Sequence, residues 1–506
     1  MKEKPNTRLL TNMSSYLILQ IVNLLVGIVL PRLYLAIYGS EVNGIISTIN
    51  SFITYFSYLE AGLGLSLIHS LYKPLAEKNK GNINEILTYS KKQYQKISYI
   101  YFILVVLLSL IFPLVSGSQE LSHIEFVLLI FVIGFYGAFD FYSMSKYRVL
   151  LTADKKEYVI SYAMIAAQII RFVFVWLVLQ LNVSVVLVKI VPVLTLFVRS
   201  VILKIYVARK YPYVTFNASR LPEPVLTKNR WDALLLQISI NTSTALPVLI
   251  VSQVLGYKEA NVYAVYSLVI SAVIALVSAL SSGVAPVFGE KIVSKEDITD
   301  MYRVYEWGVT FVLTLIFSVC GMMMLPFVKL YVSVVDDINY IYASYAVLFS
   351  LWGALYSFRI PATAIINAAA LYKETKISNI LNLVLQIVFG ITFACFFGIN
   401  GVLIAMIAAA LHRNISMALI IERKLMPNTF VKTTMLQVVM CLIVLSSYLI
   451  GSSFISIEQI TVVNWIIAAV AAVFALLAVC FVIYGFIDCK TAKKILNIAQ
   501  NKLRNR

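Results

Sequence analysis

The sequence predicts an all-α, polytopic membrane protein with about fourteen transmembrane helices, and three observations carry this prediction. Of the 506 residues, 60% are hydrophobic and 13% are charged, with a mean hydropathy of +0.87; soluble domains carry about 25% charged residues. Apolar runs of about 20 residues, the length that crosses a bilayer, recur along the whole chain. Lysines and arginines gather between alternate runs, as the positive-inside rule requires. A water-soluble enzyme, a disordered protein and a porin-like barrel are excluded.

The helices follow from the apolar runs, since a helix needs about 20 residues at 1.5 Å each to cross the hydrocarbon layer. The predicted spans are 12–35, 44–70, 97–115, 124–143, 159–179, 183–203, 232–254, 260–285, 304–328, 340–365, 376–397, 400–421, 432–451 and 462–486. The first run is too long for the core of a signal peptide, so we expect it to remain as a helix.

The connections between the spans predict the topology. The segments expected to lie outside are short and contain only Arg32, Lys258 and Lys329 as basic residues, whereas most of the 41 lysines and arginines lie in the alternate segments. One mistaken helix would invert every later connection and remove this asymmetry. We therefore expect both termini in the cytoplasm, no extracellular catalytic domain, and two long cytoplasmic loops at 72–96 and 204–231. Most of the basic residues that give the net charge of +17 lie in these connections, so this charge does not indicate nucleic-acid binding.

The chain is predicted to contain two lobes of six helices. Boundary residues of the first half recur in the second half at one offset of 218 residues: Asn43 and Asn261, Lys155 and Lys373, Asn182 and Asn400. An even number of helices in each half makes the two copies a parallel repeat, and such transporters bind substrate between the halves near the midplane. The expected parts are an N-terminal lobe at 1–210, a linker at 211–230, a C-terminal lobe at 231–425, two additional helices at 426–490 and a basic tail at 491–506.

Ionisable residues inside the spans are the candidate binding groups, because a charge in the bilayer is costly unless it faces a cavity or a partner. The candidate cavity cations are Arg171, Arg32, Lys189 and Arg199, and more cations than anions favours an anionic ligand such as phosphate. The carboxylates Glu60 and Asp140 are candidates either for ion coupling or for neutralising neighbouring arginines. Snorkelling to the headgroups is an alternative for Arg199, Arg359 and Lys189, and anchoring at the membrane interface is an alternative for Arg32.

Uncharged polar residues recur at helical spacing and predict a polar cavity wall. Its members are Gln168, one turn before Arg171, together with Gln237, Asn241, Thr244, Asn379, Asn382 and Gln386. Hydrogen bonding between helices is an equally good explanation of these residues. The sequence contains no phosphate-binding P-loop, no HExxH and no CxxC, so we expect no cofactor, no metal site and no enzymatic activity.

Several local motifs resemble one known family. They are Pro31-Arg32-Leu33, YGSEVNG at 38–44, YLEAGL at 58–63, LYKPL at 71–75, RVLLTADK at 148–155 and GINGV at 398–402. These motifs, with the helix count and the loop positions, resemble the polysaccharide flippases. That family exports O-antigen and capsule repeat units and belongs to the multidrug/oligosaccharidyl-lipid/polysaccharide exporter superfamily.

The resemblance implies a flippase in the bacterial cytoplasmic membrane. Such a protein moves an undecaprenyl-diphosphate-linked oligosaccharide to the outer leaflet by alternating access, for surface polysaccharide biosynthesis. Its partners would be this substrate, membrane lipids, and the polysaccharide polymerase and other export proteins. A cationic central cavity would receive the diphosphate, although among the four candidate cations only Arg32 lies in a matched motif. The two additional helices resemble those that form a lipid-tail groove in lipid II flippases.

Three alternatives remain open on the sequence. A drug/cation antiporter of the same superfamily would share the fold but would prefer an acidic or apolar cavity. A membrane polymerase or ligase of lipid-linked glycans would need a large external loop, which the predicted topology lacks. A membrane scaffold without transport activity is the third alternative.

Overall fold

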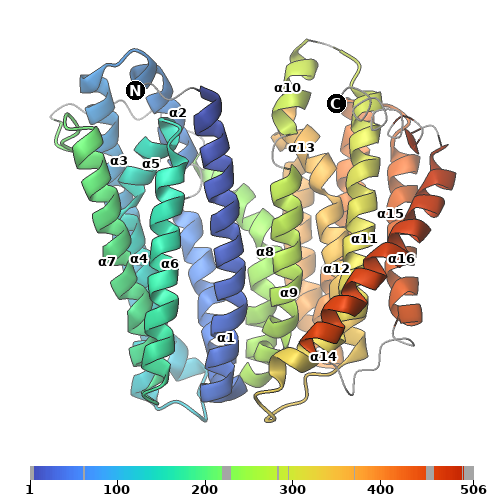
Figure 1. Ribbon diagram of the computed structural model, residues 1–506, viewed down its shortest axis with the longest axis horizontal. Helices are drawn as coiled ribbons and strands as arrows, with labels where there is room; N and C mark the ends of the chain where they lie inside the picture. Colours follow the sequence, from blue (N-terminus) through green and yellow to red (C-terminus); the bar gives the residue numbers. More distant parts are fainter. Residues whose placement is uncertain are drawn as a thin grey trace. The chain divides into compact units, whose positions relative to one another are not determined.

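The computed structural model describes residues 5–60, 63–218, 230–281, 284–294, 296–369, 371–451, 461–489, 491–492 and 494 of the chain. Every regular element in these ranges is a helix, which confirms the predicted fold class (Figure 1). The chain divides into two compact units, Met1–Asn241 and Thr242–Arg506, and the division falls within one helix, α8 (Arg230–Val254).

Unit 1 contains seven α-helices and one short 3₁₀ helix before α8. They are α1 (Pro5–Ser57), η1 (Tyr58–Glu60), α2 (Leu63–Ala76), α3 (Lys80–Val115), α4 (His123–Ser143), α5 (Ser145–Ala153), α6 (Glu157–Leu179) and α7 (Val185–Lys210). Unit 2 continues with α9 (Tyr257–Ser281), α10 (Ala285–Val293), α11 (Thr299–Val332), α12 (Ala343–Phe358), α13 (Ile360–Ala368), α14 (Tyr372–Lys424), α15 (Phe430–Gly451) and α16 (Val462–Ile487).

Within the described residues, ten helices are long and apolar enough to cross a membrane, so this is a multi-pass membrane protein. Two of the ten, α1 and α14, are double-length helices: α14 contains the two predicted spans 376–397 and 400–421, and α1 contains the span 12–35 and the first part of the span 44–70. Each is kinked at a glycine with a left-handed φ, 74° at Gly39 and 60° at Gly398. Glycine adopts this conformation without the steric cost of a Cβ atom.

Two parts of the predicted pattern differ in the structure. The span predicted at 44–70 is interrupted, because α1 ends at Ser57 and is followed by η1 and then by α2. The long polar loop expected at 72–96 is mostly helical, since α2 continues to Ala76 and α3 begins at Lys80 with Asn79 as its N-cap. Hydropathy alone marks where a helix leaves the apolar layer, and a polar helix end therefore resembles a loop in the sequence.

The helices of unit 1 pack around their apolar faces. Helices α1, α6 and α7 run side by side (Figure 1), and α4 packs against α7. Val26 and Tyr34 of α1 contact Val175 of α6 and Val188 of α7 in one buried cluster. This cluster fixes the spacing of three of the four helices that line the cavity described below.

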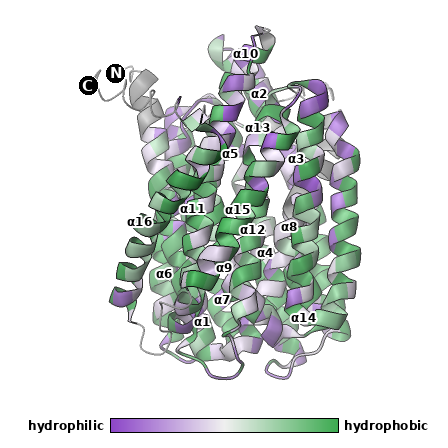
Figure 2. Ribbon diagram, turned by 90° about the vertical axis from the view of Figure 1, so that its right-hand side faces the viewer, coloured by the Kyte–Doolittle hydropathy of each residue, from purple (hydrophilic) through white to green (hydrophobic). Residues whose placement is uncertain are grey.

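The additional helices α15 and α16 belong to unit 2, where both pack against α11. The hydroxyl groups of Thr314 on α11 and Tyr484 on α16 are 2.6 Å apart and share a hydrogen bond. On its other sides α16 exposes large apolar residues such as Ile467 and Phe474. Figure 2 shows that the helices are mostly hydrophobic along their length, with most of the hydrophilic residues toward their ends. Lipid contact explains such a surface.

Candidate functional site

Unit 1 encloses a cavity of about 110 Å³ between α1, α4, α6 and α7. Its lining residues are Asn23, Tyr136, Met164, Ala167, Gln168, Arg171, Thr195, Leu196 and Arg199. Three residues that the sequence predicted as cavity residues therefore come together here: Gln168, Arg171 and Arg199.

Helix α6 presents an amide and a guanidinium to this cavity one turn apart. The Nε2 of Gln168 donates a hydrogen bond of 2.8 Å to the Oδ1 of Asn23, which ties α6 to α1. The Nε of Arg171 is buried and has no hydrogen-bond partner in the described part of the chain. A buried donor of this kind costs about 1–3 kcal/mol if it stays unsatisfied. Arg171 is therefore ready to bind an anionic or other accepting group.

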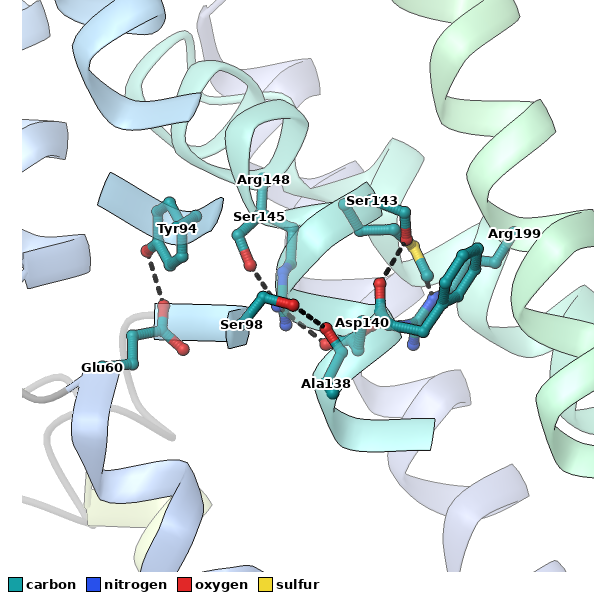
Figure 3. Close-up of polar contacts among 11 residues, drawn as sticks. Glu60, Tyr94, Ser98, Ala138, Asp140, Ser143, Ser145, Arg148 and Arg199 are labelled. Atoms are coloured by element: carbon teal, nitrogen blue, oxygen red, sulfur yellow. Dashed lines mark hydrogen bonds and ion pairs between the residues drawn. The ribbon is translucent and has the colours of Figure 1, made fainter. Parts of the chain in front are cut away.

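Asp140 on α4 lies between two arginines (Figure 3). Arg199 on α7 donates from Nη2 to its Oδ1, and Arg148 on α5 donates from Nη2 to its Oδ2 over 2.8 Å. Ser145 also accepts a hydrogen bond of 3.0 Å from Arg148. One carboxylate thus serves two cations, and the group keeps a net positive charge.

Lys189 and Arg32 are not among the residues that line the cavity. Lys189 lies with its Nζ 3.7 Å from the centroid of the Tyr34 ring, a cation–π contact, and close enough to Arg171 for the two charges to repel each other. Arg32 is half-buried on α1. The structure therefore brings two of the four predicted cations into the cavity and places a third near it.

The remaining predicted residues lie elsewhere. Glu60 is in η1, where its Oε1 accepts a hydrogen bond of 2.6 Å from the Tyr94 hydroxyl, apart from Asp140 (Figure 3). Asn382 lies in unit 2. The side chains of Gln237 and Asn241 are outside the described residues.

Asn382 lines a second and smaller cavity, which lies within unit 2. This cavity measures about 10 Å³ and is lined by Ser243, Trp352, Leu355, Tyr356, Arg359, Asn382, Met406, Ala410, Arg413 and Asn414. Two arginines therefore meet in unit 2 as well.

Sequence reasoning missed Arg148, Asn23 and Arg413 as site residues. Arg148 lies beyond the span predicted at 124–143, in a segment that reads as a connection, although it is part of the motif at 148–155. Arg413 lies inside the span predicted at 400–421, shortly before the basic residues Arg423 and Lys424. The signal that could have found both was available: Arg148 is eight residues after Asp140, and Arg413 interrupts an apolar run.

Neither cavity resembles a metal centre. No group of three or more His, Cys, Asp or Glu side chains that could hold a metal ion occurs among the residues that the structure describes. The chemistry available in unit 1 is that of guanidinium and amide donors, which suits recognition of an anionic oxygen.

No known family profile and no curated protein matches the sequence. Solved structures do share the fold. An inward-facing multidrug resistance MATE family transporter of the MOP superfamily has a TM-score of 0.62 and 15% identity, over 83% of this chain and 98% of that one. The lipid II flippase MurJ in an inward closed conformation has a TM-score of 0.66 and 12% identity, over 94% of this chain and 98% of that one. A eukaryotic MATE transporter has a TM-score of 0.54 and 15% identity, over 86% and 97%.

Proposed function

We propose that this protein, which shares its fold with MATE and MurJ transporters, is a flippase. Its substrate would be an undecaprenyl-diphosphate-linked oligosaccharide repeat unit, moved across the bacterial cytoplasmic membrane by alternating access, with both termini in the cytoplasm. The observation that carries the proposal is the cationic cavity of unit 1, in which Arg171 and Arg199 lie with amide donors.

The charge of this cavity supports an anionic headgroup. Asp140 neutralises one of its two arginine partners, so that Arg171 and one further positive charge remain for the ligand. Guanidinium groups bind phosphate oxygens in bidentate geometry. In this proposal Arg171 binds the diphosphate, Gln168 and Asn23 orient it, and Asp140 serves as a counter-ion that holds Arg199 and Arg148 in place. Lys189 and Arg32 add positive potential along the path to the cavity.

The size of the cavity supports a headgroup over a complete drug molecule. Pockets for drug-sized ligands measure about 300–1,000 Å³, whereas this one measures about 110 Å³. The diphosphate would occupy it, and the sugar and the lipid tail would lie outside unit 1's cavity.

A drug/cation antiporter is the second candidate, because the multidrug transporters match the fold with TM-scores up to 0.62. It differs from the flippase in the charge of its ligand. A cationic drug would be repelled by Arg171, which has no carboxylate partner among the described residues.

Reconstitution separates the two candidates. Purified protein in liposomes is assayed in parallel for flipping of a fluorescent undecaprenyl-diphosphate oligosaccharide, by loss of accessibility to an external reagent, and for uptake of a cationic dye under a proton or sodium gradient. The flippase predicts transport of the lipid-linked sugar without dye uptake. Dye uptake without flipping would establish the antiporter and overturn the proposal.

A further inference from the structure

The small cavity of unit 2 holds two arginines that the flippase proposal does not use. Arg413, on the second half of α14, is only 5% exposed, and its Nε and Nη1 have no hydrogen-bond partner within the described ranges. Arg359, at the junction of α12 and α13, has its guanidinium carbon 3.9 Å from the centroid of the Tyr356 ring. Neither arginine has an ion pair with a described carboxylate.

The other polar groups around this cavity are mostly donors. The Nε1 of Trp352 and both the Nδ2 and the Oδ1 of Asn382 are buried and lack a partner among the described residues, and both side chains are 1% exposed. Of these three atoms, only the Oδ1 of Asn382 is an acceptor. The Ser243 oxygen accepts a hydrogen bond of 2.7 Å from the Nε2 of Gln386, which leaves its own proton available for donation. No aspartate or glutamate is among the lining residues.

Such an arrangement is unfavourable without a ligand. Two neighbouring cations repel each other, and a buried charge without a counter-ion is strongly destabilising. Each unsatisfied donor adds about 1–3 kcal/mol. A water molecule would accept some of these hydrogen bonds but would leave the charge unneutralised, whereas an anion satisfies both requirements.

The size of the cavity limits the anion. A volume of about 10 Å³ is close to the least room that one water molecule needs, which favours a monatomic anion over a phosphate. We propose that the cavity formed by Arg359, Arg413, Trp352, Asn382 and Ser243 is a binding site for a single chloride ion. This site lies wholly within unit 2 and does not depend on the substrate of unit 1.

Radioactive chloride tests the proposal on the purified full-length protein in detergent. Samples are prepared in sodium gluconate, and ³⁶Cl⁻ is added in a scintillation proximity assay. We expect saturable binding of about one chloride per chain, displaced by bromide and unaffected by sulfate or diphosphate at the same ionic strength. Absence of saturable binding, or displacement by diphosphate as effective as by bromide, would overturn the proposal.

Variants locate the site. Arg413→Gln should weaken chloride binding at least about tenfold, since hydrogen bonds to charged groups contribute about 1.5–3 kcal/mol each. Arg423→Gln is the matched control, because Arg423 is exposed on the same helix, and it should bind as the wild type does. Should Arg413→Gln fail to fold, Arg359→Gln and Trp352→Phe remove other members of the site and should each weaken binding. Wild-type affinity in the folded variants would show that chloride binds elsewhere and would overturn the proposal.

Discussion

The cavities of the two units correspond under the predicted 218-residue repeat and differ in charge balance and in size. The offset of 218 residues found at the helix boundaries also links their lining residues: Met164 and Asn382, Thr195 and Arg413, Leu196 and Asn414. The cavity of unit 1 measures about 110 Å³ and that of unit 2 about 10 Å³. The cavity of unit 1 thus has room for a headgroup, and that of unit 2 has room for far less.

The difference in charge balance comes from a few substitutions between the halves. In unit 1, Asp140 neutralises an arginine of α7, and the residue 218 positions later is Phe358. In unit 2 the arginines therefore have no equivalent carboxylate. Gln386 lies 218 residues after Gln168, and each donates a hydrogen bond to a helix far earlier in the chain, Gln168 to Asn23 of α1 and Gln386 to Ser243 of α8. The hydrogen bond between helices is thus common to both units, and the charges differ.

The largest effect is expected from Asp140→Asn. This change leaves Arg199, whose side chain is 9% exposed, without its counter-ion, and Arg148 loses the same partner. Breaking a buried ion pair from one side costs about 3–5 kcal/mol. The free energy of unfolding, measured by denaturant titration in detergent, should fall by about this amount and expression should drop. Arg413→Gln is the contrast in unit 2, because it leaves no described carboxylate unpaired and should cost less. Equal stability of Asp140→Asn and the wild type would contradict the counter-ion role.

Arg171→Ala should reduce flipping of the lipid-linked sugar about 10- to 100-fold with insertion and folding intact, since one charged hydrogen-bonding group is lost from the site. Arg171→Lys should restore only part of the rate, because an ammonium group cannot make bidentate contact. Arg209→Ala, an exposed arginine on α7, is the matched control. The rates are measured in proteoliposomes with equal amounts of folded protein. A wild-type rate in Arg171→Ala would remove this residue from the site.

Replacing Gln168 or Gln386 by leucine should lower the free energy of unfolding by a smaller amount. Gln386 is 5% exposed and Gln168 is half-buried, so the hydrogen bond in unit 2 is the more protected from water. Gln386→Leu should lower the free energy of unfolding by about 1–1.5 kcal/mol and Gln168→Leu by about 0.5–1 kcal/mol. Gln168→Leu should also slow flipping, and Gln386→Leu should not if only unit 1 binds the headgroup. The reverse order of the two transport effects would move the substrate site to unit 2.

The smallest effect is expected from Glu60→Gln. Glu60 accepts a hydrogen bond from the Tyr94 hydroxyl, and a glutamine oxygen can accept the same hydrogen bond. The variant should express normally and lose no more than about 1 kcal/mol. Transport measured across a pH series then reports on coupling: loss of its pH dependence would assign Glu60 a coupling proton, and an unchanged profile would make its role structural.

The fold could be predicted from the sequence, and the site only in part. Hydropathy, helix length and the distribution of Lys and Arg carry the fold, because the bilayer imposes the same requirement on every span. Arg171, Arg199 and Gln168 were found because a polar group in an apolar run is conspicuous. Arg148 was missed because it lies beyond the predicted span, where charge is expected, and Arg413 because basic residues follow it closely in the sequence. The pairing of Asp140 with two arginines depends on the approach of α4, α5 and α7, which no local pattern encodes.

Binding of the diphosphate in the cavity of unit 1 can be tested by changing the lipid carrier of the substrate. The same fluorescent oligosaccharide is presented on undecaprenyl diphosphate and on undecaprenyl monophosphate, and flipping is measured in proteoliposomes with the wild type and with Arg171→Ala. The wild type should flip the diphosphate-linked form at least about tenfold faster than the monophosphate-linked form. Arg171→Ala should remove most of this preference, because losing the second phosphate and losing the guanidinium remove the same contact. Equal rates for both carriers in the wild type, or a preference that survives in Arg171→Ala, would contradict binding of the diphosphate in this cavity.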